Sequence, residues 1–248
     1  MSGTIIITGS GRGIGAATAL LASQKGYSVC VNYTNRREEA EAVATTIRDK
    51  GGQAIAVQAD VSHEVDVQNL FDTATGELGP LVALVNNAGI TGKVGRFADV
   101  NTESLRRVLD INVIGTMLCS REAIRRMSTT YGGKGGGIVN ISSRATYFGG
   151  PGDYVHYAAS KAAVETFTLG LAREVANEGI RVNCVSPGVI ETEIHTSMGD
   201  PQRLQRIAGQ IPLQRVGKPE EIAAAVLWLL SAEASYCTGS VLMVSGGR

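Results

Sequence analysis

A tyrosine and a lysine four positions apart, Tyr157 and Lys161, have the clearest capacity for chemistry in this chain. Four residues are close to one helical turn, so both side chains share a face if the segment is a helix. An ammonium group beside a phenol favours the phenolate and lowers the phenol pKa from its usual value of about 10. A phenol tuned in this way can exchange a proton with an oxygen whose charge changes during a reaction. The pair predicts acid–base chemistry at a carbonyl or alcohol oxygen.

A serine would complete this set. Ser143 lies 14 positions before Tyr157, after an apolar run that we expect to be a strand. Its hydroxyl can hydrogen-bond the reacting oxygen and fix its orientation. Ser142 is the rival for this role. Tyr154 is the rival of Tyr157, but the residue four positions after it is Ala158 and not a lysine.

A glycine-rich turn follows the first predicted strand. Its sequence is Thr8-Gly9-Ser10-Gly11-Arg12-Gly13-Ile14-Gly15, and a helix is expected to begin within it. Glycines let backbone N–H groups approach a pyrophosphate, and the helix N-terminus supplies free donors and the positive end of its dipole. The spacing differs from the usual G-x-G-x-x-G, because three residues separate Gly9 from Gly13. In this position the turn predicts a dinucleotide-binding site.

The end of the second predicted strand bears on which dinucleotide binds. That strand ends in Val31-Asn32-Tyr33, and the next acidic residue is Glu38. In NAD-binding proteins an acid at this place accepts a hydrogen bond from the ribose 2′-hydroxyl, and it would repel the 2′-phosphate of NADP. Arg12, and Arg36 or Arg37, could pair with that phosphate, although the last two could equally be a solvated helix start. NADP is therefore favoured over NAD.

Strand-like and helix-like segments alternate along the whole chain. The predicted strands span residues 4–8, 28–32, 54–58, 81–85, 137–141, 181–185 and 240–244. The predicted helices span residues 14–25, 37–50, 64–77, 102–128, 157–177 and 219–231. Most strands are continuous apolar runs, as expected for strands buried on both faces of a parallel sheet. The pattern predicts one doubly wound α/β (Rossmann) domain over residues 1–248, with about seven parallel strands and helices on both faces.

Composition limits the partners that we expect. The 248 residues are 44% hydrophobic, and 23 basic residues balance 23 acidic ones, which gives no electrostatic reason to expect nucleic acid or an anionic membrane. No signal peptide or membrane-spanning stretch is evident, and the four cysteines are widely spaced, so the cytoplasm is favoured. The histidines His63, His156 and His195 lie at no metal-ligand spacing, so no metal site is expected.

Seven segments, in order, resemble the short-chain dehydrogenase/reductase family. They are the glycine turn at 8–15, Asp60-Val61, Asn86-Asn87-Ala88-Gly89, Asn112, Ser143, Tyr157-Ala158-Ala159-Ser160-Lys161 and Pro187-Gly188-Val189-Ile190-Glu191-Thr192. They cover nearly the whole chain. Within the family the chain most resembles bacterial reductases similar to 3-oxoacyl-carrier-protein reductase and glucose 1-dehydrogenase. The family uses the second of its paired serines, which favours Ser143, although the spacing from Ser143 to Tyr157 is one residue longer than its common one.

The resemblance implies a role for each matching residue. Tyr157 would be the acid–base group and Ser143 would orient the substrate. Lys161 would tune the phenol and bind the nicotinamide ribose, and Asn112 would hold a water that links Lys161 to solvent. The implied cofactor-binding residues are Gly9, Arg12, Gly13, Ile14, Gly15, Asn32, Tyr33, Asp60, Val61, Asn87, Ala88, Gly89, Tyr157, Lys161, Pro187, Gly188, Ile190 and Thr192.

The resemblance also implies an activity and an assembly. The expected reaction is NADP-dependent hydride transfer that interconverts a secondary alcohol and a ketone or aldehyde on a small-molecule substrate. A 3-oxoacyl-carrier-protein reductase, with Arg121, Arg125 and Arg126 as a basic patch for an acidic carrier, is one alternative, and a regulator that binds NADPH without catalysis is the other. A segment at about 189–212, which includes His195, would form a substrate lid. The helices at 102–128 and 157–177 are apolar on more than one side and would form interfaces of a homotetramer.

Overall fold

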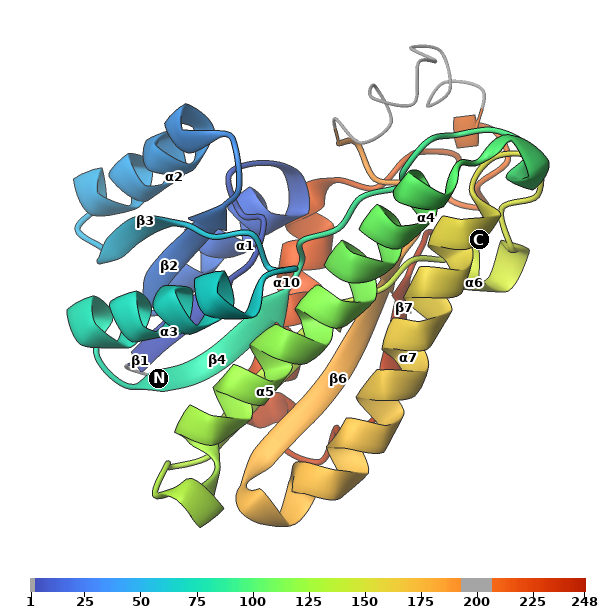
Figure 1. Ribbon diagram of the computed structural model, residues 1–248. Coiled ribbons are helices and arrows are strands. Elements are labelled where there is room, and N and C mark those ends of the chain that lie inside the picture. Colours follow the sequence, from blue (N-terminus) through green and yellow to red (C-terminus); the bar gives the residue numbers. More distant parts are fainter. Residues whose placement is uncertain (1–2, 193–206) are drawn as a thin grey trace.

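Within the part of the chain that the structure describes, seven strands form one sheet in which every neighbouring pair is parallel. In the computed structural model, which describes residues 3–192 and 207–248, the strand order is β3-β2-β1-β4-β5-β6-β7 (Figure 1). The strands are β1 (Gly3–Ile7), β2 (Tyr27–Tyr33), β3 (Ala54–Gln58), β4 (Leu81–Asn86), β5 (Gly136–Ile141), β6 (Ile180–Pro187) and β7 (Val241–Val244). The predicted doubly wound α/β fold with seven parallel strands is confirmed.

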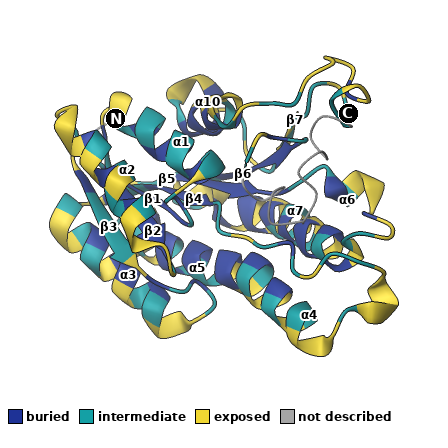
Figure 2. Cartoon of the chain, turned by 90° about the horizontal axis from the view of Figure 1, so that it is seen from above, coloured by how far each residue is buried: buried dark blue, intermediate teal, exposed yellow. Residues whose placement is uncertain are grey.

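Helices cover both faces of this sheet (Figure 2). They are α1 (Gly13–Gln24), α2 (Arg37–Asp49), α3 (Glu64–Leu78), α4 (Thr102–Leu109), α5 (Thr116–Met127), α6 (Ala145–Phe148), α7 (Val155–Val175) and α10 (Pro219–Leu230). Helices α1, α2 and α10 share one core with the sheet, and α3, α5 and α7 share the other. The short helix α6 is the one element of this set that the sequence pattern does not predict.

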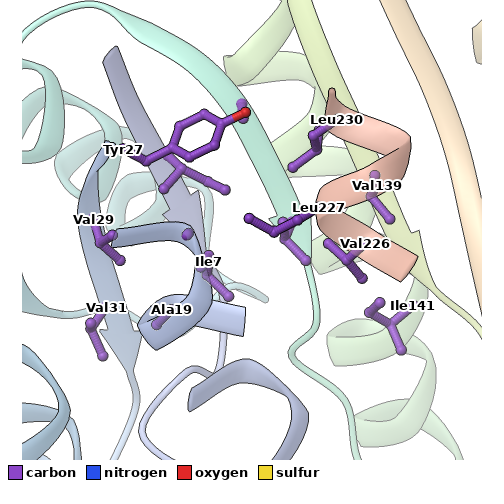
Figure 3. Close-up of a cluster of buried hydrophobic side chains, with 14 of the residues drawn as sticks. Ile7, Ala19, Tyr27, Val29, Val31, Val139, Ile141, Val226, Leu227 and Leu230 are labelled. Atoms are coloured by element: carbon purple, nitrogen blue, oxygen red, sulfur yellow. The ribbon is translucent and has the colours of Figure 1, made fainter. Parts of the chain in front are cut away.

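Alternate residues of the central strand β1 enter these two cores. Ile5 and Ile7 belong to the core beneath α1, α2 and α10, whereas Ile6 belongs to the opposite core. All three side chains are fully buried. Figure 3 shows the first core, in which Val226 and Leu227 of α10 lie over the strands. Burial on both faces explains why these strands appear in the sequence as unbroken apolar runs.

The prediction of a single continuous helix over residues 102–128 is wrong, because the helix is interrupted. Helix α4 ends at Leu109, a π-helical segment spans Asp110–Gly115, and α5 begins at Thr116. A π-turn holds one residue more than an α-turn and is frequent at functional sites. Asn112 lies within this segment, so the local widening of the helix sets the direction of its side chain. Apolar periodicity does not reveal so local a change.

The carboxyl ends of the parallel strands lie along one edge of the sheet, and the strand order reverses between β1 and β4. Ligands bind at such an edge in open α/β sheets. The glycine turn follows β1, Asn32 and Tyr33 end β2, and Ser143 follows β5. The fold therefore brings these predicted site residues to one place.

Two further expectations concern the substrate lid and membrane-spanning helices. The predicted lid at about 189–212 falls largely on residues 193–206, which lie outside the described residues, as does His195. Among the helices that the structure describes, none is both long enough and apolar enough to span a membrane.

Candidate active site

A cavity of about 630 Å³ lies along the carboxyl edge of the sheet, within the size range of small-molecule and cofactor sites. The glycine turn and the ends of β2 and β3 line one end of it, and Ser143, Tyr157 and Lys161 line the other. All the residues that the sequence predicts to be catalytic or cofactor-binding line this cavity, except Gly15 and Asn112. The structure thus brings together residues that are as many as 183 positions apart in the chain, from Gly9 to Thr192.

The glycine turn packs tightly against the segment that follows β4. Gly9 has a φ of 61°, in the left-handed region that favours glycine. A Cβ atom on Gly15 would lie 2.6 Å from both the Asn87 side-chain nitrogen and the Gly9 carbonyl oxygen, so a larger residue does not fit. Gly13 and Ile14 line the cavity where α1 begins. A helix N-terminus beside a cavity offers backbone N–H donors that suit a pyrophosphate.

The sequence assigns no role to Thr8, yet this residue joins the glycine turn to the end of β4. Its Oγ1 accepts hydrogen bonds from the backbone N–H groups of Asn87 and Ala88, each at 3.0 Å. In return, the Asn87 side chain donates to the carbonyl oxygens of Thr8 and Gly9 at 2.9 Å. The sequence feature that could have revealed this role is a threonine directly after a buried strand. The polar groups of Thr8 and Asn87 therefore hold the turn in shape.

Asn32 lines the cavity, but its side chain is occupied by the protein. Its Oδ1 accepts from the Gly9 N–H at 3.1 Å. Its Nδ2 lies within hydrogen-bond reach of the carbonyl oxygens of Tyr33, Val57 and Ala59, at 3.1–3.4 Å. The residue is only 1% exposed. Asn32 therefore shapes the turn and β3, and its amide is not available to a ribose.

Arginines lie beyond the end of β2, where a 2′-phosphate is expected. Arg12 and Arg36 line the cavity, and Arg37 does not. Arg36 also forms an ion pair with Glu39, with 2.6 Å between Nη1 and Oε1. This end of the cavity therefore offers guanidinium groups suited to a phosphate, and that of Arg36 is shared with a carboxylate.

Asp60 is held by a residue that the sequence does not single out. Arg107 of α4 donates to Asp60 Oδ2 at 2.7 Å and to Ser62 Oγ at 3.0 Å. Burial acts to raise the pKa of Asp60, but hydrogen bonds from Ser62 and Arg107 outweigh it and lower the pKa to about 2. The carboxylate stays ionised and fixed at the wall of the cavity.

At the opposite end, Ser143 and Tyr157 line the cavity together, and the Ser143 hydroxyl acts to lower the pKa of the phenol. Ser142 points elsewhere, and its Oγ donates to Glu165 Oε1 at 2.7 Å. The ring of Tyr154 meets the Tyr157 ring edge-on, with 5.7 Å between the centroids. The geometry therefore favours Ser143 over Ser142 and places Tyr154 beside the phenol of Tyr157.

Lys161 lies near the Tyr157 ring, with Nζ 5.9 Å from the ring centroid, and it donates to the Ile141 carbonyl oxygen at 2.8 Å. Burial raises the pKa of Tyr157 to about 12, against the opposing effect of Ser143. Burial also lowers the pKa of Lys161 to about 8. In the protein alone, desolvation of the phenolate has the largest effect, and the expectation that Lys161 together with the oxidised nicotinamide depresses the phenol pKa stays a prediction.

Asn112 lies outside the cavity lining and connects three elements. Its Oδ1 accepts from the Ile90 N–H, and its Nδ2 donates to the Ile90 carbonyl oxygen and to Ser160 Oγ, each at 2.9 Å. A Cβ atom on Gly89 would lie 3.1 Å from Lys161 Nζ and 3.3 Å from Asn112 Oδ1, which shows how closely these groups meet. The π-helical segment thus joins the segment after β4 to α7.

The remaining candidates take no direct part in this site. His156 is buried away from the cavity lining, beside Gly92. His63 immediately precedes α3. Over residues 3–192 and 207–248, no group of three or more His, Cys, Asp or Glu side chains could hold a metal ion.

Comparisons with known proteins agree with this geometry. Residues 9–248 match the family model described as enoyl-(acyl carrier protein) reductase. The chain is 50% identical over 243 residues to the uncharacterized oxidoreductase YgfF of Escherichia coli (strain K12), covering 98% of each chain. It is 39% identical to glucose 1-dehydrogenase 2 of Bacillus subtilis (strain 168), covering 98% of this chain and 93% of that one. The crystal structure of a short chain dehydrogenase from Burkholderia cenocepacia J2315 in complex with NADP matches with a TM-score of 0.90 at 33% identity, covering 98% of this chain and 96% of that one.

The fold and the site define a Rossmann-type oxidoreductase. The chain belongs to the short-chain dehydrogenase/reductase family, and it is an enzyme of that family.

Proposed function

We propose that this enzyme uses NADP to interconvert a secondary alcohol and a ketone or aldehyde, with Tyr157 as the acid–base group. The observation that carries the proposal is that Ser143, Tyr157 and Lys161 line the same cavity as the glycine turn, with Lys161 Nζ 5.9 Å from the centroid of the Tyr157 ring. The reduced nicotinamide, when bound, supplies the hydride that reduces the carbonyl carbon. Tyr157 Oη donates its proton to the carbonyl oxygen, which becomes the alcohol.

The neighbouring side chains assist that proton transfer. The Ser143 hydroxyl donates to the substrate oxygen and orients it. The Lys161 ammonium stabilises the phenolate that forms when Tyr157 loses its proton. Asn112 holds the segment around Ile90 against α7 and supports a water that connects Lys161 to solvent.

NADP is the cofactor that this site favours. No acidic residue ends β2, and Arg12 and Arg36 line the cavity nearby, together with Glu39. The Burkholderia cenocepacia relative is bound to NADP. The Arg36–Glu39 ion pair must loosen for Arg36 to meet a phosphate fully.

A carrier-protein substrate receives less support from this structure. Arg121 pairs with Glu64, and Arg126 pairs with Glu122 and Asp72. Arg125 also pairs with Glu122. The expected basic patch is therefore compensated by carboxylates and offers little attraction to an acidic carrier.

Exposed apolar side chains on helices that cover opposite faces of the sheet support a homotetramer. Leu109, Met117 and Leu169, on α4, α5 and α7, are each 37–47% exposed. Trp228 of α10, which covers the opposite face of the sheet, is 40% exposed. A dimer of dimers requires two distinct faces. All four cysteines are free, which suits a reducing compartment such as the cytoplasm.

The test is turnover with NADPH and NADH over a panel of ketones, aldehydes, sugars and acyl thioesters, followed by Tyr157→Phe. We expect NADPH to be preferred, and Tyr157→Phe to lower kcat by about 10³-fold, because the proton donor is lost. NADPH binding, followed by fluorescence, should persist in the variant. Tyr147→Phe, on an exposed tyrosine outside the cavity lining, is the matched control. Turnover that survives Tyr157→Phe unchanged would show that another group is the acid–base residue.

A further inference from the structure

Glu165 lies on the same face of α7 as the two reactive residues of that helix. It follows Lys161 by four positions and Tyr157 by eight. Its side chain is outside the cavity lining and cannot meet a ligand there. It is instead in contact with the segment that carries Ser143.

The contact consists of two hydrogen bonds to one carboxylate oxygen. Glu165 Oε1 accepts from Ser142 Oγ at 2.7 Å and from Thr146 Oγ1 at 3.2 Å. Ser142 and Thr146 lie on either side of Ser143, one before it and one three residues after it. A single carboxylate thus holds both ends of the short turn that presents the Ser143 hydroxyl to Tyr157.

The opposite side of this turn is fixed by the backbone of β6. The Ser142 N–H donates to the Val185 carbonyl oxygen at 2.8 Å, and the Arg144 N–H donates to the Pro187 carbonyl oxygen at 2.9 Å. These backbone hydrogen bonds attach the turn to the sheet, and they do not attach it to α7. Glu165 supplies a side-chain link between this turn and α7 that does not involve the reacting groups.

The strength of this link depends on the carboxylate. The Ser142 hydroxyl has one proton, and its other nearby acceptor is the Lys161 carbonyl oxygen at 3.3 Å. Ser142 is only 3% exposed, so water does not readily replace a lost partner. Hydrogen bonds to an ionised acceptor are shorter and stronger than those between neutral groups.

We propose that Glu165 is a positioning residue, which holds Ser143 against Tyr157 by binding Ser142 and Thr146. The inference rests on the proposed function of Ser143 and Tyr157. A carboxylate at this place acts on the chemical step and not on cofactor binding, because the glycine turn and Asp60 are held by other contacts.

The proposal predicts a kinetic signature. Without the carboxylate, the turn moves away from α7 and carries the Ser143 hydroxyl away from Tyr157. Ser143 opposes the rise in the Tyr157 pKa that burial causes, so its displacement raises this pKa further. Alcohol oxidation needs the phenolate as base, and its rate should then reach a plateau at a higher pH.

The experiment compares Glu165→Ala and Glu165→Gln with Glu174→Ala, an exposed position on the same helix. We expect Glu165→Ala to lower kcat about tenfold, with Kd for NADPH within about twofold of the wild type. Glu165→Gln keeps an acceptor oxygen and should recover part of the loss. The pH profile of alcohol oxidation should shift upward in Glu165→Ala and remain unchanged in Glu174→Ala.

A second background shows whether Glu165 acts through its two partners. Ser142→Ala combined with Thr146→Val should reproduce the loss in kcat, and adding Glu165→Ala to that pair should change little more. This pair and Glu165→Gln also provide the test if Glu165→Ala does not fold. A crystal structure of any folded member should show Ser143 displaced from Tyr157.

Each outcome bears on a distinct claim. If Tyr157→Phe abolishes turnover while Glu165→Ala leaves kcat and the pH profile unchanged, the inference about Glu165 is wrong and the proposed function stands. Additive losses in the triple variant would mean that Glu165 acts by another route. If Tyr157→Phe retains turnover, the proposed function itself fails.

Discussion

The two ends of the cavity use their polar side chains in opposite ways. At the catalytic end, Tyr157 and Lys161 are buried, and burial has moved both pKa values away from their ordinary ranges. At the glycine-turn end, the amides of Asn32 and Asn87 are bound to backbone groups of the protein. The catalytic end keeps its polar side chains available for chemistry, whereas the glycine-turn end uses the Asn32 and Asn87 amides to hold the backbone in shape.

This difference follows from what each end has to bind. A reacting oxygen changes its charge, and a titratable side chain can respond to that change. A pyrophosphate keeps its charge, and fixed N–H groups at a helix N-terminus are sufficient for it. Substitutions at the catalytic end should therefore act on rate and pH dependence, whereas those at the glycine-turn end should act first on stability.

The largest effect that we expect is that of Lys161→Met at the catalytic end. Removing the ammonium leaves the phenolate without its charged neighbour, and kcat should fall about 10³-fold, or about 4 kcal/mol in activation free energy. Steady-state kinetics at fixed NADPH measures this loss. A variant with wild-type kcat would show that Lys161 is structural.

The pH dependence of the wild type sharpens the same point. Burial lowers the pKa of Lys161 to about 8, so the ammonium is lost as the pH rises through this value. Carbonyl reduction should therefore slow above about pH 8, and the residual rate of Lys161→Met should lack this limb. The same limb in both proteins would assign it to another group.

At the glycine-turn end, Asn32→Asp should destabilise the fold by about 3 kcal/mol and should not convert the enzyme to NAD. The new carboxylate would face the carbonyl oxygens of Tyr33, Val57 and Ala59, which now lie within reach of the amide nitrogen. Denaturant unfolding measures the loss. Asn35→Asp, at a cavity-lining position close by, is the comparison for charge alone. A stable Asn32→Asp enzyme that prefers NADH would contradict the structural role of Asn32.

The smallest effect is expected for Asp60→Asn. The folded-state pKa of Asp60 is lowered to about 2, so its contribution to stability is present above its unfolded value of 3.8 and is lost as the pH falls towards 2. Because Arg107 is partly exposed, we expect a loss of only about 1 kcal/mol at neutral pH. Unfolding at pH 7 and at pH 2.5 measures it, and the difference between wild type and variant should shrink at the lower pH. An equal difference at both values would assign the effect to packing.

Much of this enzyme could be predicted from short-range patterns. Apolar runs predicted seven parallel strands, and the spacing of Tyr157 and Lys161 predicted their shared helix face, because both signals reside in neighbouring residues. The glycine turn was predicted because backbone conformation limits which residues fit it.

The tertiary structure decided what those patterns leave open. The π-turn around Asn112, the binding of Asn32 to its own backbone neighbours and the contact of Glu165 with Ser142 each depend on segments that meet only after folding. The sequence by itself determined which groups can do chemistry, since that is a property of side-chain type and local spacing. Which of them are free, buried or bound to the protein was decided by packing, because desolvation and hydrogen-bond partners come from distant parts of the chain.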